Sequence, residues 1–320
     1  MKRFKNFLYV MNHDISEPSP SLLRAVSLAK NNQADLTLLL VIPKLFLSSS
    51  IKKVGMGTVE MEKTVFAREQ ENLLQLAKTL DKDVNVNVLL KVGKRYLESV
   101  RLVLSQNVDM LIKEVDKVSW LDRLIGSDDM HLLRNCPCPV WLMKKDEKPD
   151  YKQVLAAVDF DSEDDETCND ELNHMILGLS CSIALAEFST VHVVTAYNAA
   201  DAGFIGLWAS DPENVEKQML ESEFRNSRFQ MDLLFHNLKE EIGNESFNYL
   251  SLIPHLVKGR AGEELPKIAK SIGADLVVMG TIARTGIAGL VIGNTAETIL
   301  NQLNSSVLAI KPKGFVSPIS

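Results

Sequence analysis

The sequence predicts an α/β protein built from two tandem, doubly wound, five-stranded parallel-sheet domains of the Rossmann-like kind. Patterns typical of strands and helices alternate along the chain, and the same set of patterns occurs twice. A charged, proline-bearing stretch at residues 145–150 separates the two copies, as a domain linker would. We therefore expect an N-terminal domain over residues 1–145 and a C-terminal domain over residues 151–313.

The individual elements follow from apolar runs and amphipathic periodicity. In the first copy the expected strands are 7–11, 36–42, 86–92, 110–112 and 139–144, and the expected helices include 19–31, 65–80 and 95–106. The second copy repeats this with strands 154–158, 191–197, 251–257, 276–279 and 306–311, and helices 169–187, 216–242, 263–272 and 295–303. The acids Asp109 and Asp275 precede the fourth strand of each copy. Five strands alternating with four helices favour a parallel, right-handed topology in each half.

A glycine-rich loop in the second copy is the most informative stretch for function. The apolar strand at residues 276–279 leads into a loop with glycines at positions 280, 286, 289 and 293, and Asn294 then opens a helix. Bare N–H groups and the positive end of the helix dipole favour an anion there, and glycine lets a phosphate approach the backbone. The same glycines also suit a turn that serves packing alone. Their spacing matches neither the Gly-Lys-Ser/Thr nor the dinucleotide pattern.

Three positions that are far apart in the second copy should meet at one edge of its sheet. Asp159 follows the first strand, Ala196 lies at the end of the second, and the Gly280 loop follows the fourth. Ligands of open parallel sheets bind at the carboxyl ends of the strands, beside the point where the strand order reverses. The C-terminal half is therefore expected to hold a pocket.

Composition excludes several classes of partner. The 320 residues are 46% hydrophobic and 24% charged, with a net charge of −7, which argues against nucleic acid or an anionic membrane as a main partner. No apolar run approaches the length of a membrane span, and the run at residues 7–11 is too short for a signal peptide. Four cysteines make no disulfide framework. We expect a cytoplasmic protein.

Other candidate motifs favour structural roles. Cys136-Pro137-Cys138 has one residue between the cysteines, which is too few for the usual redox or zinc arrangement. The acids at residues 161–166 could hold Mg²⁺, but such a run is typical of a solvated loop. The six histidines show no metal-ligand spacing, and no nucleophile elbow is present. We expect a binding protein and no catalytic residues.

The motifs of both copies resemble those of the universal stress protein family over nearly the whole chain. The resemblance is carried by residues 280–287 and 292–297, by the closing run 308–312, and by 131–137 and 139–141 in the first copy. It implies a stress-response protein of the tandem type. It also implies that the last strands, 139–144 and 306–311, pair within one chain and cover two sheet edges that would otherwise be exposed.

The resemblance further implies a nucleotide site in the second copy. Nucleotide-binding members carry Gly, two residues, Gly, nine residues, then Gly with Ser or Thr, which falls here on Gly280, Ala283, Gly293 and Asn294. Ala283 adds a methyl group, while Asn294 replaces a hydroxyl but still suits a helix cap. Arg284 could either supply charge to a phosphate or lie in solvent. The set expected to bind ATP or AMP, with Mg²⁺ accompanying the nucleotide, is Val158, Asp159, Ala196, Met279, Gly280, Thr281, Ala283, Arg284, Gly293, Asn294, Thr295 and Ala296.

The first copy departs from this pattern. Asn12 replaces the aspartate, residues 114–125 contain no glycine, and only Gly126-Ser127 remains before the helix. The acids Asp116, Asp122, Asp128 and Asp129 would repel a triphosphate. We expect this half to keep the fold without binding ATP in the family manner.

Two long connections, residues 44–63 and 198–218, leave a second function open. Their apolar residues indicate either a lid packed on the core or a surface that lines an apolar ligand between the halves. One hypothesis is a binding module whose C-terminal half senses a nucleotide and relays it to protein partners. The alternative is a non-nucleotide scaffold, or a carrier of an apolar or nucleotide-sugar-lipid ligand between the domains. A slow ATPase is a third, and a homodimer of the whole chain stays open.

Overall fold

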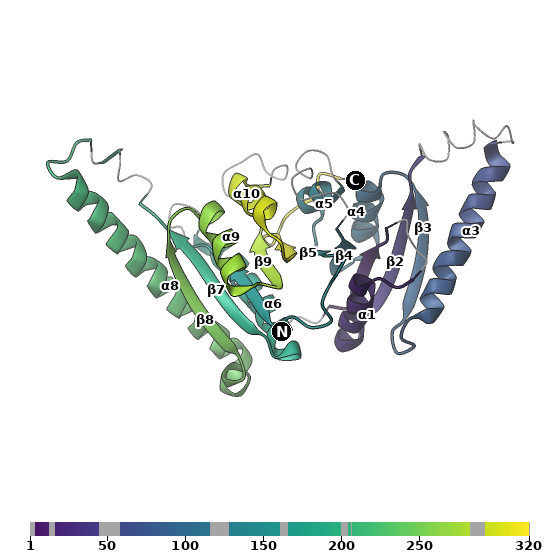
Figure 1. Cartoon of the computed structure of the whole chain (residues 1–320), viewed down its shortest axis with the longest axis horizontal. Coiled ribbons are helices and arrows are strands. Elements are labelled where there is room, and N and C mark those ends of the chain that lie inside the picture. The colour runs from purple at the N-terminus through teal and green to yellow at the C-terminus, as the bar shows by residue number, and fades with distance from the viewer. Residues whose placement is uncertain are drawn as a thin grey trace.

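The computed structural model describes residues 4–12, 17–44, 58–115, 128–160, 166–199, 204–205, 207–281 and 292–319. Ten strands form one continuous sheet in the order β3-β2-β1-β4-β5-β10-β9-β6-β7-β8 (Figure 1). The strands are β1 (Asn6–Val10), β2 (Asp35–Ile42), β3 (Val86–Val92), β4 (Met110–Glu114), β5 (Val140–Met143), β6 (Gln153–Ala157), β7 (Thr190–Tyr197), β8 (Ser251–Lys258), β9 (Leu276–Gly280) and β10 (Ser306–Ile310). The described helices are α1 (Pro20–Asn32), α3 (Thr58–Thr79), α4 (Arg95–Gln106), α5 (Asp128–Asn135), α6 (Glu166–Glu187), α8 (Pro212–Asn248), α9 (Ala261–Ile272) and α10 (Asn294–Gln302).

Each half has the same doubly wound topology. The strand order is 3-2-1-4-5 within both halves, and the strands inside each half are parallel. The order reverses between β1 and β4 in the first half and between β6 and β9 in the second. The α/β fold class expected from the sequence is therefore confirmed, and each half has one switch point at its carboxyl edge.

The two halves join through their last strands, as expected. β5 and β10 pair antiparallel, with Leu308 opposite Trp141. This pairing leaves β3 and β8 as the outer strands, and Figure 1 shows the long helices α3 and α8 at the two far ends of the molecule. Internal pairing thus satisfies the two strand edges that would otherwise lie open in the middle.

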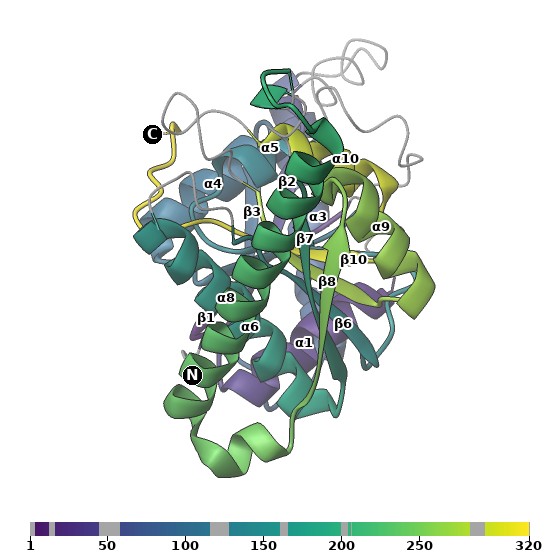
Figure 2. The same ribbon diagram turned by 90° about the vertical axis from the view of Figure 1, so that its left-hand side faces the viewer.

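Helices cover both faces of the sheet. One apolar cluster packs α1, α3, α6 and α8 against alternate strand residues, and a second packs α4, α5, α9 and α10 against the others. Trp141, at 2% exposure, belongs to the first cluster in the centre of the sheet. Figure 2 shows α8 running along β8 on the first of these faces.

The matched acids Asp109 and Asp275 perform the same structural task in the two halves. One carboxylate oxygen of Asp109 accepts from the backbone N–H groups of Lys5 and Asn6, at 2.7 and 3.0 Å. One oxygen of Asp275 likewise accepts from Lys152 and Gln153, at 2.7 and 3.1 Å. Each aspartate therefore fixes the start of the first strand of its half beside the fourth strand.

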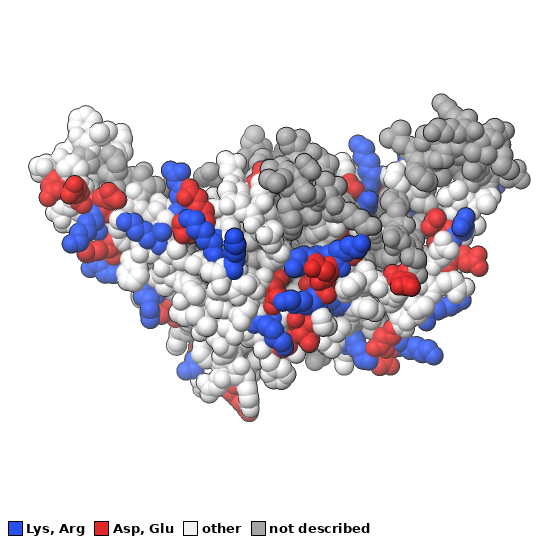
Figure 3. Space-filling view, viewed as in Figure 1, with Lys and Arg blue, Asp and Glu red and all other residues white. Residues whose placement is uncertain are grey.

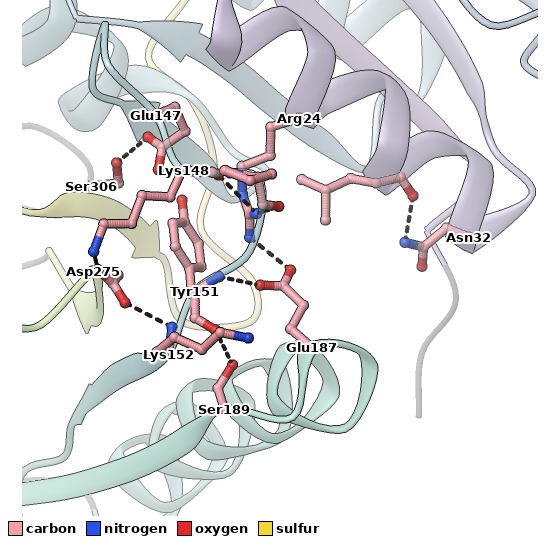
Figure 4. A network of polar contacts seen from close by, with 12 residues as sticks. Arg24, Asn32, Glu147, Lys148, Tyr151, Lys152, Glu187, Ser189, Asp275 and Ser306 are labelled. Carbon is pink, nitrogen blue, oxygen red and sulfur yellow. Dashed lines mark hydrogen bonds and ion pairs between the residues drawn. The ribbon is translucent and has the colours of Figure 1, made fainter.

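A buried ion pair ties the halves together on the face that α1 and α6 share. Arg24 of α1 lies 2.7 Å from Glu187 at the end of α6, and the two side chains are 2% and 9% exposed. Arg24 also donates to the Lys148 and Pro149 carbonyls of the linker, and its guanidinium lies 3.6 Å from the ring centre of Tyr151. Figure 4 shows this group of side chains meeting at the linker, so the linker is held on both sides.

The long connection of the second half differs from the expectation. Residues 198–218 were expected to connect β7 to a helix, but α8 already begins at Pro212, with the Asp211 side chain accepting from the N–H of Asn214. The apolar residues before it do not pack on the core, because Phe204, Leu207 and Trp208 are 69%, 76% and 83% exposed. In the first half, residues 45–57 of the other connection lie outside the described residues.

Cys136 and Cys138 form no disulfide in the described structure. Both thiols are free and buried, with their sulfur atoms 3.5 Å apart. The hydrogen bond with Cys136, together with burial, raises the pKa of Cys138 well above its usual value, so the thiol stays protonated. Next to them, Lys311 of β10's end donates to the Leu133 and Arg134 carbonyls that end α5. Lys311 thus joins β10 of the second half to α5 of the first half, on the face of the sheet that α4, α5, α9 and α10 cover.

Candidate functional site

The carboxyl edge of the second half brings together the residues that the sequence placed there. Ala157 pairs with Val194 on one side and Met279 on the other, so the ends of β6, β7 and β9 lie side by side. Val158 and Met279 are buried, whereas Asp159 is exposed. Ala196 is half-buried near the end of β7. One exposed carboxylate therefore stands at an apolar switch point.

Helix α10 begins beside the end of β9. The N–H of Gly293 donates to the Thr281 carbonyl at 3.1 Å, which holds the start of the helix against the strand. The first intrahelical bond runs from Glu297 to the Gly293 carbonyl. The N–H groups of Asn294, Thr295 and Ala296 thus precede the helical ladder and are the donors that a helix N-terminus offers to an anion.

Asn294 does not cap this helix, contrary to the expectation. Gly293 is the N-cap residue, with φ −62° and ψ 141°, and no side chain accepts from the first turn in the described structure. Because Gly293 is fixed by Thr281, Asn294 becomes the first helical residue. Its side chain is exposed at the helix end.

Thr281 adds a buried polar group at the same place. Its side chain is 1% exposed, and its hydroxyl has no hydrogen-bond partner among the described residues. By strand alternation it lies on the face that α10 covers, with Val277 and Met279. A buried hydroxyl without a partner is costly, so its position beside the open helix end is consistent with an external acceptor.

Asn173 of α6 is a positioning residue that the sequence did not reveal. Its side chain is 3% exposed and makes two hydrogen bonds to the backbone of Asp159: the Asp159 N–H donates to Oδ1 at 3.0 Å, and Nδ2 donates to the Asp159 carbonyl at 2.7 Å. A buried asparagine in an amphipathic helix was the available signal. Its amide fixes the backbone of Asp159 and thereby the direction in which the Asp159 side chain extends from the sheet.

Gly280 packs closely against α6. A Cβ at this position would lie 2.9 Å from the Cδ2 atom of Leu172. This supports the packing role for this glycine, on the face away from α10. The anion-type donors lie on the other face, so the two roles do not compete.

The remaining parts of the expected site cannot be placed. Ala283 and Arg284 lie outside the described residues, as do Gly286, Gly289 and the acids at 161–165. Within the described residues, no group of three or more His, Cys, Asp or Glu side chains could hold a metal ion.

The same edge of the first half is filled by its own side chains. By strand register, Lys113 and Glu114 of β4 occupy the places of Met279 and Gly280. Buried Lys113 lies 2.8 Å from Asp129 in the first turn of α5, where an anion would meet the helix end. The Ser21 hydroxyl donates to Glu114 at 2.6 Å.

Three further contacts close this edge. Arg95 donates to the Asn12 side chain at 3.1 Å and lies 3.5 Å from the Asp128 carboxylate. The Tyr9 hydroxyl lies 2.7 Å from that of Ser21, and burial raises the pKa of Tyr9 to about 12. The charged groups at the edge of the first half, Lys113, Arg95 and the carboxylates that they contact, therefore all come from this half itself.

Two histidines also meet in the second half, on β7 and β8. His192 Nδ1 lies 2.8 Å from His255 Nε2, and His192 Nε2 lies 2.8 Å from the Gln153 side chain. Burial lowers the pKa of both histidines, and His255 adds to the effect on His192. The pair packs on the α9 face as a neutral cluster, in line with the structural role expected from the sequence.

The fold and the contrast between its halves define a tandem Rossmann-like α/β protein in which the first half fills its edge with its own side chains. The model of the universal stress protein family matches residues 3–144 and 150–311. The chain therefore belongs to that family and carries its domain twice.

Relatives of the same length support this assignment. The chain is 27% identical over 326 residues to universal stress protein E of Photorhabdus laumondii, covering 100% of this chain and 98% of that protein. It is 26% identical over 332 residues to universal stress protein E of Escherichia coli K12, with the same coverage. A crystal structure of a functionally unknown protein from Pseudomonas aeruginosa PAO1 shares the fold, with a TM-score of 0.66 and 22% identity over 98% of this chain and 94% of that one. No described helix is long and apolar enough to cross a membrane.

Proposed function

We propose that the chain is a cytoplasmic stress-response binding module whose C-terminal half binds ATP or a related nucleotide and relays its presence to protein partners. The proposed domains are residues 1–145 and 151–313. The N-terminal half serves as a fixed partner that completes the sheet and binds no nucleotide.

One observation carries this proposal: the two halves treat the same edge in opposite ways. In the first half Lys113, Asp129 and Glu114 occupy it with internal ion pairs and hydrogen bonds. In the second, Thr281 has a buried hydroxyl without a described partner, next to the first turn of α10, whose N–H groups have no side-chain cap among the described residues. An anion would satisfy both donors, as it does at other helix N-termini.

Each residue of the second half has a proposed role in this site. The N–H groups of Asn294, Thr295 and Ala296, with the Thr281 hydroxyl, would donate to phosphate oxygens. Asp159 would accept from the ribose or the base, and Ala196 would contact the base. Val158, Met279, Gly280 and Gly293 would shape the backbone around the ligand, and Ala283 and Arg284 stay proposed members of the loop.

The proposed module binds its nucleotide and does not turn it over as an enzyme. Asn173 holds the backbone of Asp159, and the proposed role of the Asp159 carboxylate is to accept from the ribose or the base. Mg²⁺ would enter with the phosphates, since it takes most of its ligands from phosphate oxygens and water in such sites. Any hydrolysis is expected to be slow.

Isothermal titration calorimetry with ATP and AMP tests the proposal. Wild type should bind one nucleotide per chain. Asp159→Ala and Thr281→Val should each weaken binding by about tenfold, the loss of roughly one hydrogen bond to a charged group. Asn12→Ala, at the matching position of the first half, is the control and should leave affinity unchanged. Binding of two nucleotides per chain, or equal loss in Asn12→Ala, would reject the assignment to the C-terminal half.

The alternative function is a non-nucleotide scaffold or apolar-ligand carrier. The exposed apolar residues Phe204, Leu207 and Trp208 favour it, because large exposed apolar groups mark interaction surfaces. Native mass spectrometry of freshly purified protein separates the two. A retained nucleotide supports the first function, and a retained lipid supports the second.

A further inference from the structure

A cavity of about 690 Å³ lies at the outer end of the second half, next to the end of β7 that also carries Ala196 of the proposed nucleotide site. It is lined by the first turns of α8 and by the last residues of β7 and β8. Its volume is in the range of small-molecule and peptide sites. All of its lining residues are described, and none belongs to the nucleotide set.

The cavity exists because α8 extends beyond the sheet. Further along the helix, Met231, Leu234 and Leu238 are buried against the strands. Leu220 and Phe224 continue the same helical stripe toward the N-terminus, but there the strands have ended. The stripe therefore faces open space instead of a core, and Phe224 is 43% exposed.

An aromatic pair lies at the inner end of the cavity, beside Arg225 and Lys258. The rings of Tyr197 and Phe224 meet edge to face with their centres 5.5 Å apart. Tyr197 is the last residue of β7 and pairs in register with Lys258 of β8. An apolar or aromatic side chain placed against Tyr197, Phe224 and Leu220 would cover the apolar surface that α8 leaves open.

Charge is graded along the cavity. The outer end carries Glu213, Glu216 and Lys217, one excess negative charge, and the inner end carries Glu221, Arg225 and Lys258, one excess positive charge. Figure 3 shows acidic side chains at the free end of α8 and basic ones below them. Arg225 reaches Glu221 at 3.9 Å, whereas no ion pair of Lys217 or Lys258 occurs among the described residues.

This arrangement selects the class of ligand. A polyphosphate would meet Glu213 and Glu216, and a wholly apolar ligand would strip water from both ends without replacing it. Glu213 and Arg225 are separated by about 18 Å along the helix, at 1.5 Å per residue. An extended chain covers that length with about five residues.

We propose that this cavity binds an extended peptide segment of about five residues that has a basic side chain at the outer end and, at the inner end, an apolar or aromatic side chain followed by an acidic one. Tyr197 and Phe224 hold the apolar side chain, and Glu213 and Lys258 select the charged ends. The cavity is a protein-docking site whose lining residues are not members of the nucleotide set.

Nuclear magnetic resonance titration with capped pentapeptides tests this. Acetyl-Lys-Gly-Gly-Phe-Glu-amide should bind saturably and shift the resonances of Tyr197, Leu220 and Phe224. It should bind about fivefold tighter than the same peptide with Lys at both ends or Glu at both ends, since an exposed charge pair contributes up to roughly 1 kcal/mol. Phe224→Ala should weaken binding by about tenfold or more.

Two variants make the result decisive. Lys258→Glu makes the inner end negative, so the peptide with two lysines should become the preferred ligand. Phe229→Ala removes a ring from the same helix that is 64% exposed and outside the cavity, and it should bind like wild type. The proposal fails if wild type shows no saturable binding, if Phe224→Ala binds like wild type while still folded, or if Lys258→Glu leaves the preference unchanged.

Discussion

The ion pair between Arg24 and Glu187 offers the sharpest test of how the halves are joined. Arg24→Met keeps the length of the side chain but leaves the Glu187 carboxylate buried without its cation. Breaking a buried pair from one side costs about 3–5 kcal/mol. At about 2.1 cal/mol/K per residue, the entropy of unfolding of this 320-residue chain is about 670 cal/mol/K if it unfolds as one unit, so the melting temperature should fall by about 4–7 °C.

The assay is differential scanning calorimetry at neutral and acidic pH. Burial raises the pKa of Glu187, while the Arg24 guanidinium opposes that rise. Without Arg24 the pKa of Glu187 should rise further, so the folded protein takes up a proton at a higher pH than the unfolded chain. The loss of stability in Arg24→Met should therefore be largest at neutral pH and shrink as the pH falls through the pKa of Glu187.

A double variant separates the unpaired charge from lost packing. Arg24→Met with Glu187→Leu leaves no buried charge, and it should recover at least half of the lost stability. The reasoning would be refuted if Arg24→Met alone changed stability by less than about 1 kcal/mol, the range of an exposed pair. A double variant less stable than the single one would also contradict it.

Three further predictions test other parts of the structure. The pKa of Asp275 is lowered because Lys148 and the backbone N–H groups outweigh the effect of burial. The ionised carboxylate therefore stabilises the fold above the ordinary aspartate pKa, and this stability is lost as the pH falls. Asp275→Asn should lower the free energy of unfolding by about 1–3 kcal/mol at pH 7, measured by urea unfolding, and should make that free energy depend less on pH in the acid range. Burial lowers the pKa of Lys311 to about 8, which pH-dependent amine labelling followed by mass spectrometry should show; a value near the ordinary lysine pKa would contradict it. Gly280→Ala should destabilise by about 1 kcal/mol through contact with Leu172, and Leu172→Ala should remove that penalty when the two are combined; a Gly280→Ala variant as stable as wild type would disprove the close packing.

The sequence predicted the order of elements well, because apolar periodicity determines which residues a strand or helix buries. The third strand of the first half and helix 95–106 coincide with their expected bounds. The start of α8 was missed although Asp211-Pro212 carries the sequence signal, an N-cap aspartate followed by proline at the first helical position. That signal was outweighed by the apolar residues just before it.

The details of the site depended on contacts between distant segments. Asp159, Ala196 and Gly280 were expected at one edge because parallel strands end together, and they lie there. Asn173 and Arg24 act through residues far away in sequence, so no local pattern indicated their partners. For the first half, the sequence predicted only that acidic residues would repel a triphosphate. The ion pair between Lys113 and Asp129 could not be predicted, because it depends on the register of β4.

The antiparallel contact of β5 with β10 has a consequence for how the two halves can evolve. Because one polypeptide carries both members of the pair, their encounter within the chain does not depend on protein concentration. A mutation in one half is never duplicated across the contact, as it would be in a symmetric homodimer. The covalent tether thus permits one half to fill its edge with an internal ion pair while the other half carries different residues there.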